Sequence, residues 1–259
     1  MPQIQTVTSR ENRWVKQIIA LQSGSKARKE SGLFVLEGLR ICSDAAENGI
    51  RFRCLAVTEA FAKKFQDAFE AFCDLSETVV QVPETLFEKI ADTDSPQGVL
   101  AVGVLPENNP SLDPNGRYLG LENLADPSNL GAVARTAEAL GVGGIVLSKG
   151  SCDAFSPKAL RASMGTLLRL PLFFCEDLCG FAKTHGLRTL ACVVERDAEP
   201  ISSLSFAAGD LLLIGNEANG LSAQTKAAAD CLVTIPMTGR AESLNAAAAA
   251  AIAMWEMMQ

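Results

Sequence analysis

The sequence predicts an α/β protein: a mostly parallel sheet with helices on both faces, preceded by a smaller α/β domain. Apolar runs of strand length alternate with segments of helical periodicity in both halves of the chain. Residues 106–116, which hold three prolines and no apolar periodicity, separate the two halves. At 259 residues, 48% of them apolar, the chain is long enough for two domains. We therefore expect domains at residues 1–105 and 117–259, joined by a linker at 106–116.

In the first domain, apolar residues at helical spacing predict a helix over residues 9–29, interrupted by the Gly and Ser residues that begin at Ser23. Short apolar runs predict strands at 33–36, 53–58, 79–82 and 98–105. Helices are expected from Gly38 to about residue 48 and from residue 59 to about 72.

In the second domain the alternation continues, which is typical of parallel strands joined by helices. We expect strands at 117–122, 144–147, 170–174, 188–194, 211–214 and 231–235. Helices are expected at 130–140, 157–164, 178–184, 223–229 and 244–257. The last helix begins with six alanines, 246–251, so we expect it to pack closely against a neighbour, with Ser243 as its N-cap.

Composition excludes several classes of protein. No apolar run approaches the ~20 residues of a membrane span, and the polar first 13 residues lack a secretory signal, so we expect a cytoplasmic protein. Eight cysteines without a Cys-x-x-Cys pair predict free buried thiols rather than disulfides or a metal site. The single histidine, His185, precedes Gly186 at a predicted helix end, which disfavours Ser-His-Asp hydrolysis and histidine-based metal catalysis.

Charge is unevenly distributed along the chain. Residues 1–64 carry eleven Lys and Arg against six acids, a net +5, whereas residues 65–130 carry two against twelve, a net −10. The whole chain has a net charge of −7. A basic first segment is compatible with RNA contact through one domain, and the alternative is a solvated surface with a random charge gradient.

Three loops that follow predicted strands carry the polar groups of interest, because ligands in open α/β sheets bind at the carboxyl ends of strands. In the first, Asp126-Pro127 turns the chain into a helix that holds Asn129 and Arg135 among Gly and Ala residues. A permanently charged, forked arginine in such surroundings suits a phosphate or a carboxylate.

The second loop is Gly215-Asn216-Glu217, followed by Gly220 and a predicted N-cap, Ser222. Gly215 would allow the backbone to approach a ligand. No Lys-Ser or Lys-Thr follows Gly220, so it is not a phosphate-binding P-loop, and no Gly-x-Gly-x-x-Gly follows a strand, which disfavours a nucleotide-dependent oxidoreductase. The third loop runs from Ile235-Pro236-Met237 to Ser243-Leu244-Asn245.

Together these loops resemble, in order and spacing, the three signature motifs of the SpoU (TrmH-type) RNA ribose 2′-O-methyltransferases of the SPOUT superfamily. The resemblance covers residues 117–259, with alanine where relatives commonly have Val after the final Asn and Ser or Val beyond it. A looser likeness, through Phe34-Val35-Leu36-Glu37-Gly38 and Ser95-Pro96-Gln97-Gly98-Val99, links the first domain to a ribosomal-protein-like RNA substrate-binding domain. The family fold implies a C-terminal trefoil knot, with the helix from Ala246 threaded through it.

The resemblance implies S-adenosylmethionine as cofactor, no metal, a homodimer, and RNA as partner. It assigns the cofactor to Gly215, Asn216, Ile235, Met237, Ser243 and Leu244. It makes Arg135 the main catalytic residue, supported through hydrogen bonds by Asn129, Glu217, Ser243 and Asn245. Because guanidinium has a pKa above ~12, we expect Arg135 to orient a phosphate and stabilise developing oxyanion charge rather than act as a base.

The fused first domain favours large-subunit ribosomal RNA as the target, by family analogy alone. Two alternatives remain at this point. One is a tRNA ribose 2′-O-methyltransferase, and the other is a non-catalytic RNA-binding protein that has kept the fold.

Overall fold

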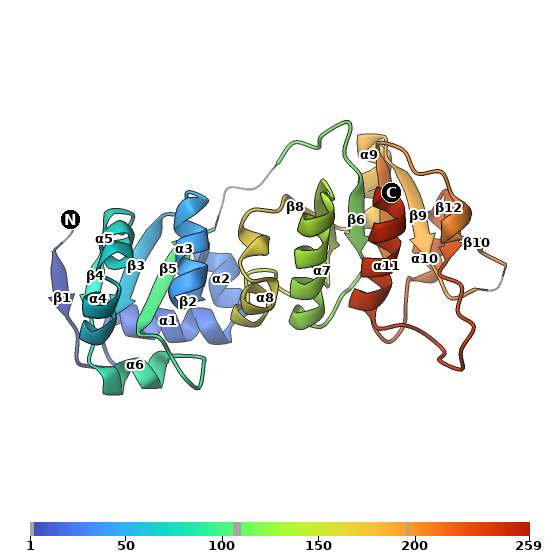
Figure 1. Cartoon of the computed structure of the whole chain (residues 1–259). Helices are drawn as coiled ribbons and strands as arrows, with labels where there is room; N and C mark the ends of the chain where they lie inside the picture. Colours follow the sequence, from blue (N-terminus) through green and yellow to red (C-terminus); the bar gives the residue numbers. More distant parts are fainter. Residues whose placement is uncertain (1–2, 106–109, 196) are drawn as a thin grey trace. The chain divides into compact units, whose positions relative to one another are not determined.

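The computed structural model describes residues 3–105, 110–195 and 197–259. It divides into two compact units: Met1–Glu107 with Phe155–Leu168, and Asn108–Ala154 with Arg169–Gln259 (Figure 1). Segment 155–168 thus packs with the first unit although it lies within the second half of the sequence. Residues 106–109 of the expected linker lie outside the described residues, and 110–117 contain neither helix nor strand.

The first unit is a five-stranded mixed sheet in the order β1-β4-β3-β5-β2. The strands are β1 (Ile4–Thr6), β2 (Leu33–Glu37), β3 (Phe52–Val57), β4 (Val79–Gln81) and β5 (Val99–Val104). The helices are α1 (Arg13–Ser23), α2 (Ser25–Ser31), α3 (Leu39–Glu47), α4 (Glu59–Lys64), α5 (Gln66–Asp74), α6 (Glu84–Ile90) and α8 (Pro157–Ser163), followed by a 3₁₀ turn at Thr166–Leu168. β5 pairs antiparallel with β2 and β3, whereas β4 pairs parallel with β1 and β3.

The second unit is a seven-stranded sheet in the order β10-β12-β9-β11-β6-β7-β8, and every pair in it is parallel. The strands are β6 (Tyr118–Leu121), β7 (Gly144–Ser148), β8 (Leu172–Cys175), β9 (Arg188–Cys192), β10 (Glu199–Pro200), β11 (Asp210–Ile214) and β12 (Cys231–Thr234). The helices are α7 (Pro127–Leu140), α9 (Leu178–His185), α10 (Ala223–Ala228) and α11 (Ala246–Met258), with a 3₁₀ turn at Ile201–Ser203.

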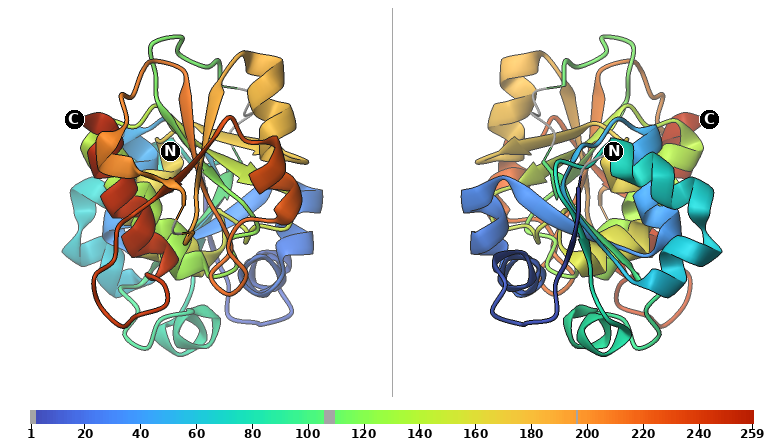
Figure 2. Two further views of the ribbon diagram at one scale, coloured as in Figure 1. Left: turned by 90° about the vertical axis from the view of Figure 1, so that its right-hand side faces the viewer. Right: turned by 90° about the vertical axis from the view of Figure 1, so that its left-hand side faces the viewer.

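Helices cover both faces of this sheet, as the sequence predicts. α7 packs against α11 on one face, and α9 lies beside α10 on the other (Figure 2). The side chains of β6, β7 and β11 are buried throughout, as in a parallel sheet covered on both faces. Because all strands run the same way, their carboxyl ends lie along one edge, where the three polar loops follow β6, β11 and β12.

Several local predictions are corrected by the structure. The helix expected over 59–72 is split at Phe65, whose backbone is not helical (φ −124°, ψ 55°). The helix expected over 9–29 is two helices meeting at Gly24, and the second continues to Ser31. Buried Arg28 makes that arrangement possible, because its guanidinium donates to the carbonyls of Leu21 and Gln22 at the end of α1.

The N-cap of α11 is Asn245 and not Ser243. Its side-chain oxygen accepts from the N–H groups of Ala247 (2.9 Å) and Ala248 (3.3 Å). Ser and Asn are both good caps, but the helix begins at Ala246, two residues later than expected. By contrast, Ser222 caps α10 and Gly186 ends α9 in the left-handed conformation, both as predicted.

Candidate cofactor and catalytic site

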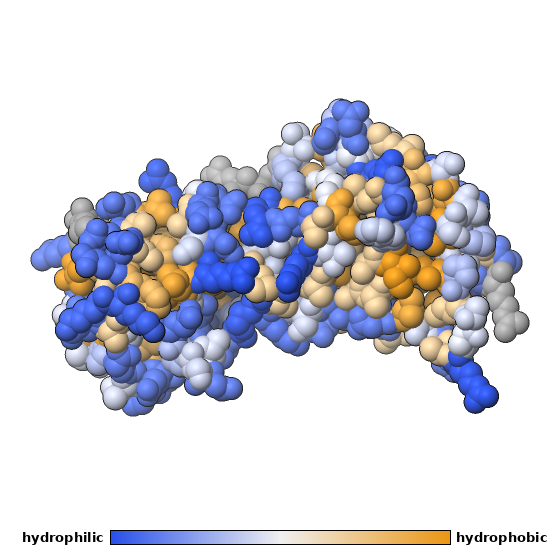
Figure 3. Space-filling model, viewed as in Figure 1, coloured by the Kyte–Doolittle hydropathy of each residue, from blue (hydrophilic) through white to orange (hydrophobic). Residues whose placement is uncertain are grey.

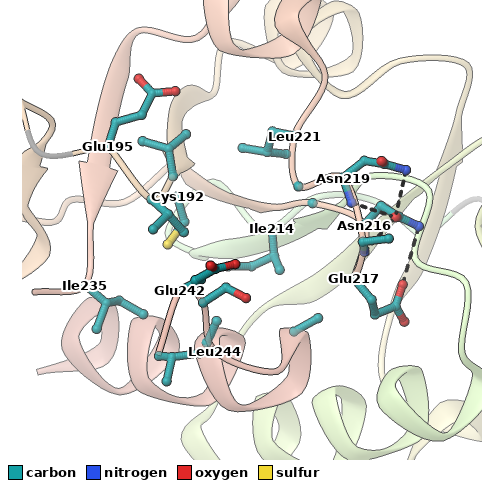
Figure 4. A pocket seen from close by; sticks show the side chains of 18 of the residues that line it. Cys192, Glu195, Ile214, Asn216, Glu217, Asn219, Leu221, Ile235, Glu242 and Leu244 are labelled. Carbon is teal, nitrogen blue, oxygen red and sulfur yellow. Dashed lines mark hydrogen bonds between the residues drawn. The ribbon is translucent and has the colours of Figure 1, made fainter. Parts of the chain in front are cut away.

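A cavity of about 410 Å³ opens at the carboxyl ends of β9, β11 and β12 (Figure 4). Its walls are the segments 192–195 after β9 and 214–221 after β11, together with Ile235 and Met237 after β12. The loop 242–244 and the first turn of α11 close it, with Lys226 of α10 nearby. The cavity therefore lies where the topology of a parallel sheet predicts a ligand site.

The wall after β11 is a tight turn that only glycine permits. Asn216 and Gly220 exchange backbone hydrogen bonds of 3.1 and 2.9 Å. A Cβ atom on Gly215 would lie 2.1 Å from the carbonyl carbon of Gly220 and 2.2 Å from the nitrogen of Leu221. Gly215 thus allows the close approach expected from the sequence, but the approaching backbone is the chain's own turn.

Glu217 organises the loop between β6 and α7. Its carboxylate accepts hydrogen bonds from the N–H groups of Ala125 (3.0 Å) and Asp126 (2.9 Å) and from the side-chain amide of Asn129 (2.9 Å). Partial burial raises the pKa of Glu217, but these hydrogen bonds outweigh it and hold the pKa below its usual range. Glu217 is therefore an anionic anchor for the loop and not a proton donor at neutral pH.

Asn216 holds the start of the same loop. Its side-chain amide donates to the carbonyl of Asn123 at 2.8 Å, while its oxygen accepts from the N–H of Ala218 at 2.9 Å. Asn123 adopts a positive φ of 51°, which is uncommon outside glycine. A second hydrogen bond fixes this conformation, from the Asn123 N–H to the hydroxyl of Ser148 (2.9 Å).

Asn245 joins the third loop to the first. Its side-chain amide donates to the side-chain oxygen of Asn129 at 3.3 Å while its oxygen caps α11. Asn129 therefore contacts both Glu217 and Asn245. Three side chains that are far apart in the sequence form one continuous hydrogen-bonded chain.

The structure brings most of the predicted residues together. The cavity lining includes Gly215, Asn216, Glu217, Ile235, Met237, Ser243 and Leu244. Asn129 and Asn245 lie beside it through the hydrogen bonds just described. Arg135 lies apart from the lining, exposed on α7, and makes no hydrogen bond or ion pair with any residue the structure describes.

The cavity also contains polar residues that the sequence did not single out. These are Cys192, Glu195, Lys226 and Glu242. Cys192 and Glu195 lie at the carboxyl end of β9, and of the three strands whose ends line the cavity this is the one whose loop has no motif-like pattern. Glu242 lies within the third loop, between residues that were singled out, and its charge was the available signal. Burial raises the pKa of the Cys192 thiol to about 11, so it is neutral.

The described part of the chain contains no cluster of three or more potential metal ligands. Its eight cysteines are unpaired. No described helix is long and apolar enough to cross a membrane.

Comparison with known proteins agrees with this architecture. Residues 116–255 match the model of the SpoU rRNA Methylase family, and residues 12–101 match that of the MRM3-like substrate binding domain. The 23S rRNA (guanosine(2553)-2′-O)-methyltransferase RlmP of Bacillus subtilis is 30% identical, over 97% of this chain and 98% of that protein. The 23S rRNA (uridine(2479)-2′-O)-methyltransferase of Streptomyces viridochromogenes is 30% identical, over 100% of this chain and 93% of that protein.

Solved structures give the same result. An AdoMet-bound rRNA methyltransferase from Sinorhizobium meliloti superposes with a TM-score of 0.87 at 29% identity, covering 98% of this chain and 97% of that one. The SpoU methyltransferase AviRb from S. viridochromogenes, in complex with AdoMet, has a TM-score of 0.82 at 26% identity, covering 95% and 98%. The α/β fold and the family expected from the sequence are both confirmed: the chain belongs to the SpoU rRNA Methylase family.

Proposed function

We propose that this protein transfers a methyl group from S-adenosylmethionine to a ribose 2′-hydroxyl of large-subunit ribosomal RNA. The observation that carries the proposal is the cavity at the ends of β9, β11 and β12, joined to the Asn129–Glu217–Asn245 hydrogen-bonded chain, in a member of this family. Relatives similar over nearly their whole length are named 23S rRNA 2′-O-methyltransferases.

The cavity fits this cofactor in size and chemistry. A volume of about 410 Å³ lies in the range of small-molecule sites. Ile214, Ile235 and Leu244 offer apolar surface to an adenine ring, while the carboxylate of Glu242 suits a positively charged group. When bound, S-adenosylmethionine supplies an electrophilic methyl group on a positively charged sulfur.

We assign cofactor contact to Gly215, Asn216, Ile235, Met237, Ser243 and Leu244, all of which line the cavity. The turn 215–220 offers mainly backbone groups to the cofactor. The hydrogen bonds within the turn fix the directions of these groups. A rigid wall of this kind binds without the cost of ordering a loop.

Arg135 is the proposed catalytic residue. Its guanidinium is exposed and has no partner among the described residues, so it is available to an RNA phosphate. It orients the ribose and stabilises negative charge developing on the 2′-oxygen. Asn129, Glu217 and Asn245 hold the loop and helix that carry it, and Ser243 supplies a hydroxyl at the cavity wall.

The first unit is the proposed RNA-binding domain. Its match to a substrate-binding family model supports this. Its basic charge is concentrated in residues 1–64, which carry eleven basic against six acidic residues. The Pro-rich stretch 106–116 supports domain limits near residues 105 and 117, and the family fold implies a trefoil knot around α11. We place the protein in the cytoplasm, where ribosomal RNA substrates are found.

A homodimer is the proposed assembly. α11 presents Ala248, Ile252 and Trp255 to solvent at helical spacing, and Trp255 is 56% exposed. Figure 3 shows apolar side chains over α7 and α11 on this face. Arg135 lies on α7, the helix packed against α11, so pairing of two such faces would bring each catalytic arginine to the subunit interface.

Mapping ribose methylation in ribosomal RNA from a strain with and without the gene tests the proposal. One 2′-O-methyl group of the large-subunit RNA should disappear, and purified protein with S-adenosylmethionine should restore it in vitro. Loss of a tRNA methyl group instead would favour the tRNA alternative. Absence of cofactor binding in calorimetry would favour a non-catalytic RNA-binding protein.

A further inference from the structure

Most charges around the cavity are already compensated. Lys226 and Glu195 form an ion pair of 3.0 Å at one side. Glu217 directs its carboxylate to the N–H groups of residues 125 and 126 and to Asn129. The first two side chains neutralise each other, and the Glu217 carboxylate, although anionic, is engaged by these three donors.

Glu242 is the exception. Figure 4 shows its carboxylate reaching into the cavity beside Ile214 and Cys192, above Leu244. It makes no hydrogen bond or ion pair with any residue that the structure describes. The neighbouring Cys192 is a neutral thiol. Among the described residues, Glu242 is therefore the charged group of the cavity wall whose carboxylate has no protein partner, and it is open to solvent and to a ligand.

The Glu242 carboxylate attracts the cofactor before methyl transfer more strongly than the product that remains afterwards. S-adenosylmethionine carries an ammonium, a carboxylate and a sulfonium, a net charge of +1. The product that remains after methyl transfer, S-adenosylhomocysteine, has lost the sulfonium charge and is neutral overall. An anionic cavity binds the first more tightly than the second, and a cavity without net charge has no such preference.

We propose that Glu242 is a specificity-determining residue that makes the site prefer the charged cofactor over its spent product. The proposal rests on the proposed methyltransferase function. Each turnover removes the charge that the carboxylate recognises, so the spent product is displaced by fresh cofactor. Glu242 thereby limits product inhibition.

Glu242 acts on binding and not on the chemical step. Positive charge on sulfur falls as the methyl group leaves, so a nearby carboxylate stabilises the bound cofactor more than the transition state. Removing the carboxylate should raise KM for S-adenosylmethionine and leave kcat unchanged or slightly higher. A residue that merely shaped the loop would lower kcat as well.

Calorimetry with S-adenosylmethionine and with S-adenosylhomocysteine tests the proposal on the purified full chain. Glu242→Gln keeps the shape of the side chain and removes its charge. We expect this substitution to weaken the binding of S-adenosylmethionine about tenfold. Affinity for S-adenosylhomocysteine should change less than twofold. Arg240→Gln, a charge change in the same loop at a residue outside the cavity lining, serves as the control and should preserve the wild-type preference.

Equal weakening of both molecules by Glu242→Gln would overturn the proposal, because the carboxylate would then bind a group that both share. No change in either affinity would overturn it too. If the wild-type chain binds neither molecule, the proposed function itself fails, an outcome separate from both of these.

Discussion

The side-chain amide of Asn245 donates a hydrogen bond of 3.3 Å to the side-chain oxygen of Asn129, a residue 116 positions earlier. The same Asn245 caps α11 with its oxygen. One side chain therefore serves both the stability of the last helix and the geometry of the site. Substitutions can separate these two roles.

Asn245→Asp should keep the cap and lose the site contact. Aspartate caps helices as well as asparagine, but two oxygens cannot donate to Asn129. We expect a melting temperature near that of the wild type and a fall in methyl transfer of about tenfold, the effect of one lost positioning contact. Asn245→Ala should in addition lose about 1 kcal/mol of stability. Equal activity of the Asp variant and the wild type would show that the contact with Asn129 is dispensable.

Arg135→Ala should retain S-adenosylmethionine binding and lose methyl transfer. Arg135 lies outside the cavity lining, so cofactor affinity by calorimetry should change less than twofold. Removing a group that stabilises transition-state charge costs about a hundredfold or more in kcat. Methylation of RNA at the wild-type rate would exclude Arg135 from the chemistry.

Gly215→Ala should destroy the cavity wall, since the added Cβ would lie 2.1 Å from backbone of Gly220. We expect a loss of about 1–3 kcal/mol in unfolding free energy, as for overpacking, and at least tenfold weaker cofactor binding. Gly239→Ala is a matched control in the third loop, because no atom lies within 4 Å of a Cβ there. Denaturant unfolding and calorimetry measure both effects; similar behaviour of the two variants would contradict the structural argument.

Trp255→Glu should convert the proposed dimer to monomer in light scattering, because a charge would enter an apolar interface. Phe174→Glu is the control, since Phe174 is exposed to the same extent, 56%, but lies on the edge strand β8. If the Trp255→Glu variant stays dimeric and the Phe174→Glu variant is monomeric, the dimer interface lies at β8 and not at α11.

Glu217 should make the fold sensitive to acid. Its pKa is lowered in the folded state, so its contribution to stability is present above the unfolded pKa of about 4.3 and is lost as pH falls through the folded value. Thermal melts of wild type and Glu217→Gln between pH 3 and 7 should differ most near neutrality and converge in acid. A constant difference at every pH would assign the effect to shape rather than to charge.

The sequence was sufficient for the parts of the fold that depend on local pattern. Buried strands such as 211–214 and the alanine-rich helix can be predicted from their composition. The alternation of strands with helices along the chain predicts a parallel sheet. Prediction from the sequence failed where contacts between distant residues determine the local structure. A second helix, α2, forms after the break at Gly24, where the Arg28 guanidinium donates to carbonyls at the end of α1. Nothing local distinguishes Asn245 from Ser243 as a cap.

The same distinction applies to the residues of the site. Gly215, Glu217 and Asn129 could be singled out because they follow strand ends in an order and spacing that match the family motifs. Their contacts could not be predicted, since the bond from Asn129 to Glu217 spans 88 positions. Glu242 was overlooked because an isolated acid in a polar loop ordinarily contacts only solvent, and only the folded loop shows that its carboxylate also reaches the cavity.

The long sequence separations across the site have a consequence for how the protein acquires activity. Contacts that span 88 and 116 positions require loop closures whose entropic cost is met only after the sheet has paired. The cavity should therefore be among the last features to form during folding. A refolding chain would regain its helical signal first and its capacity to bind cofactor in a later, slower phase.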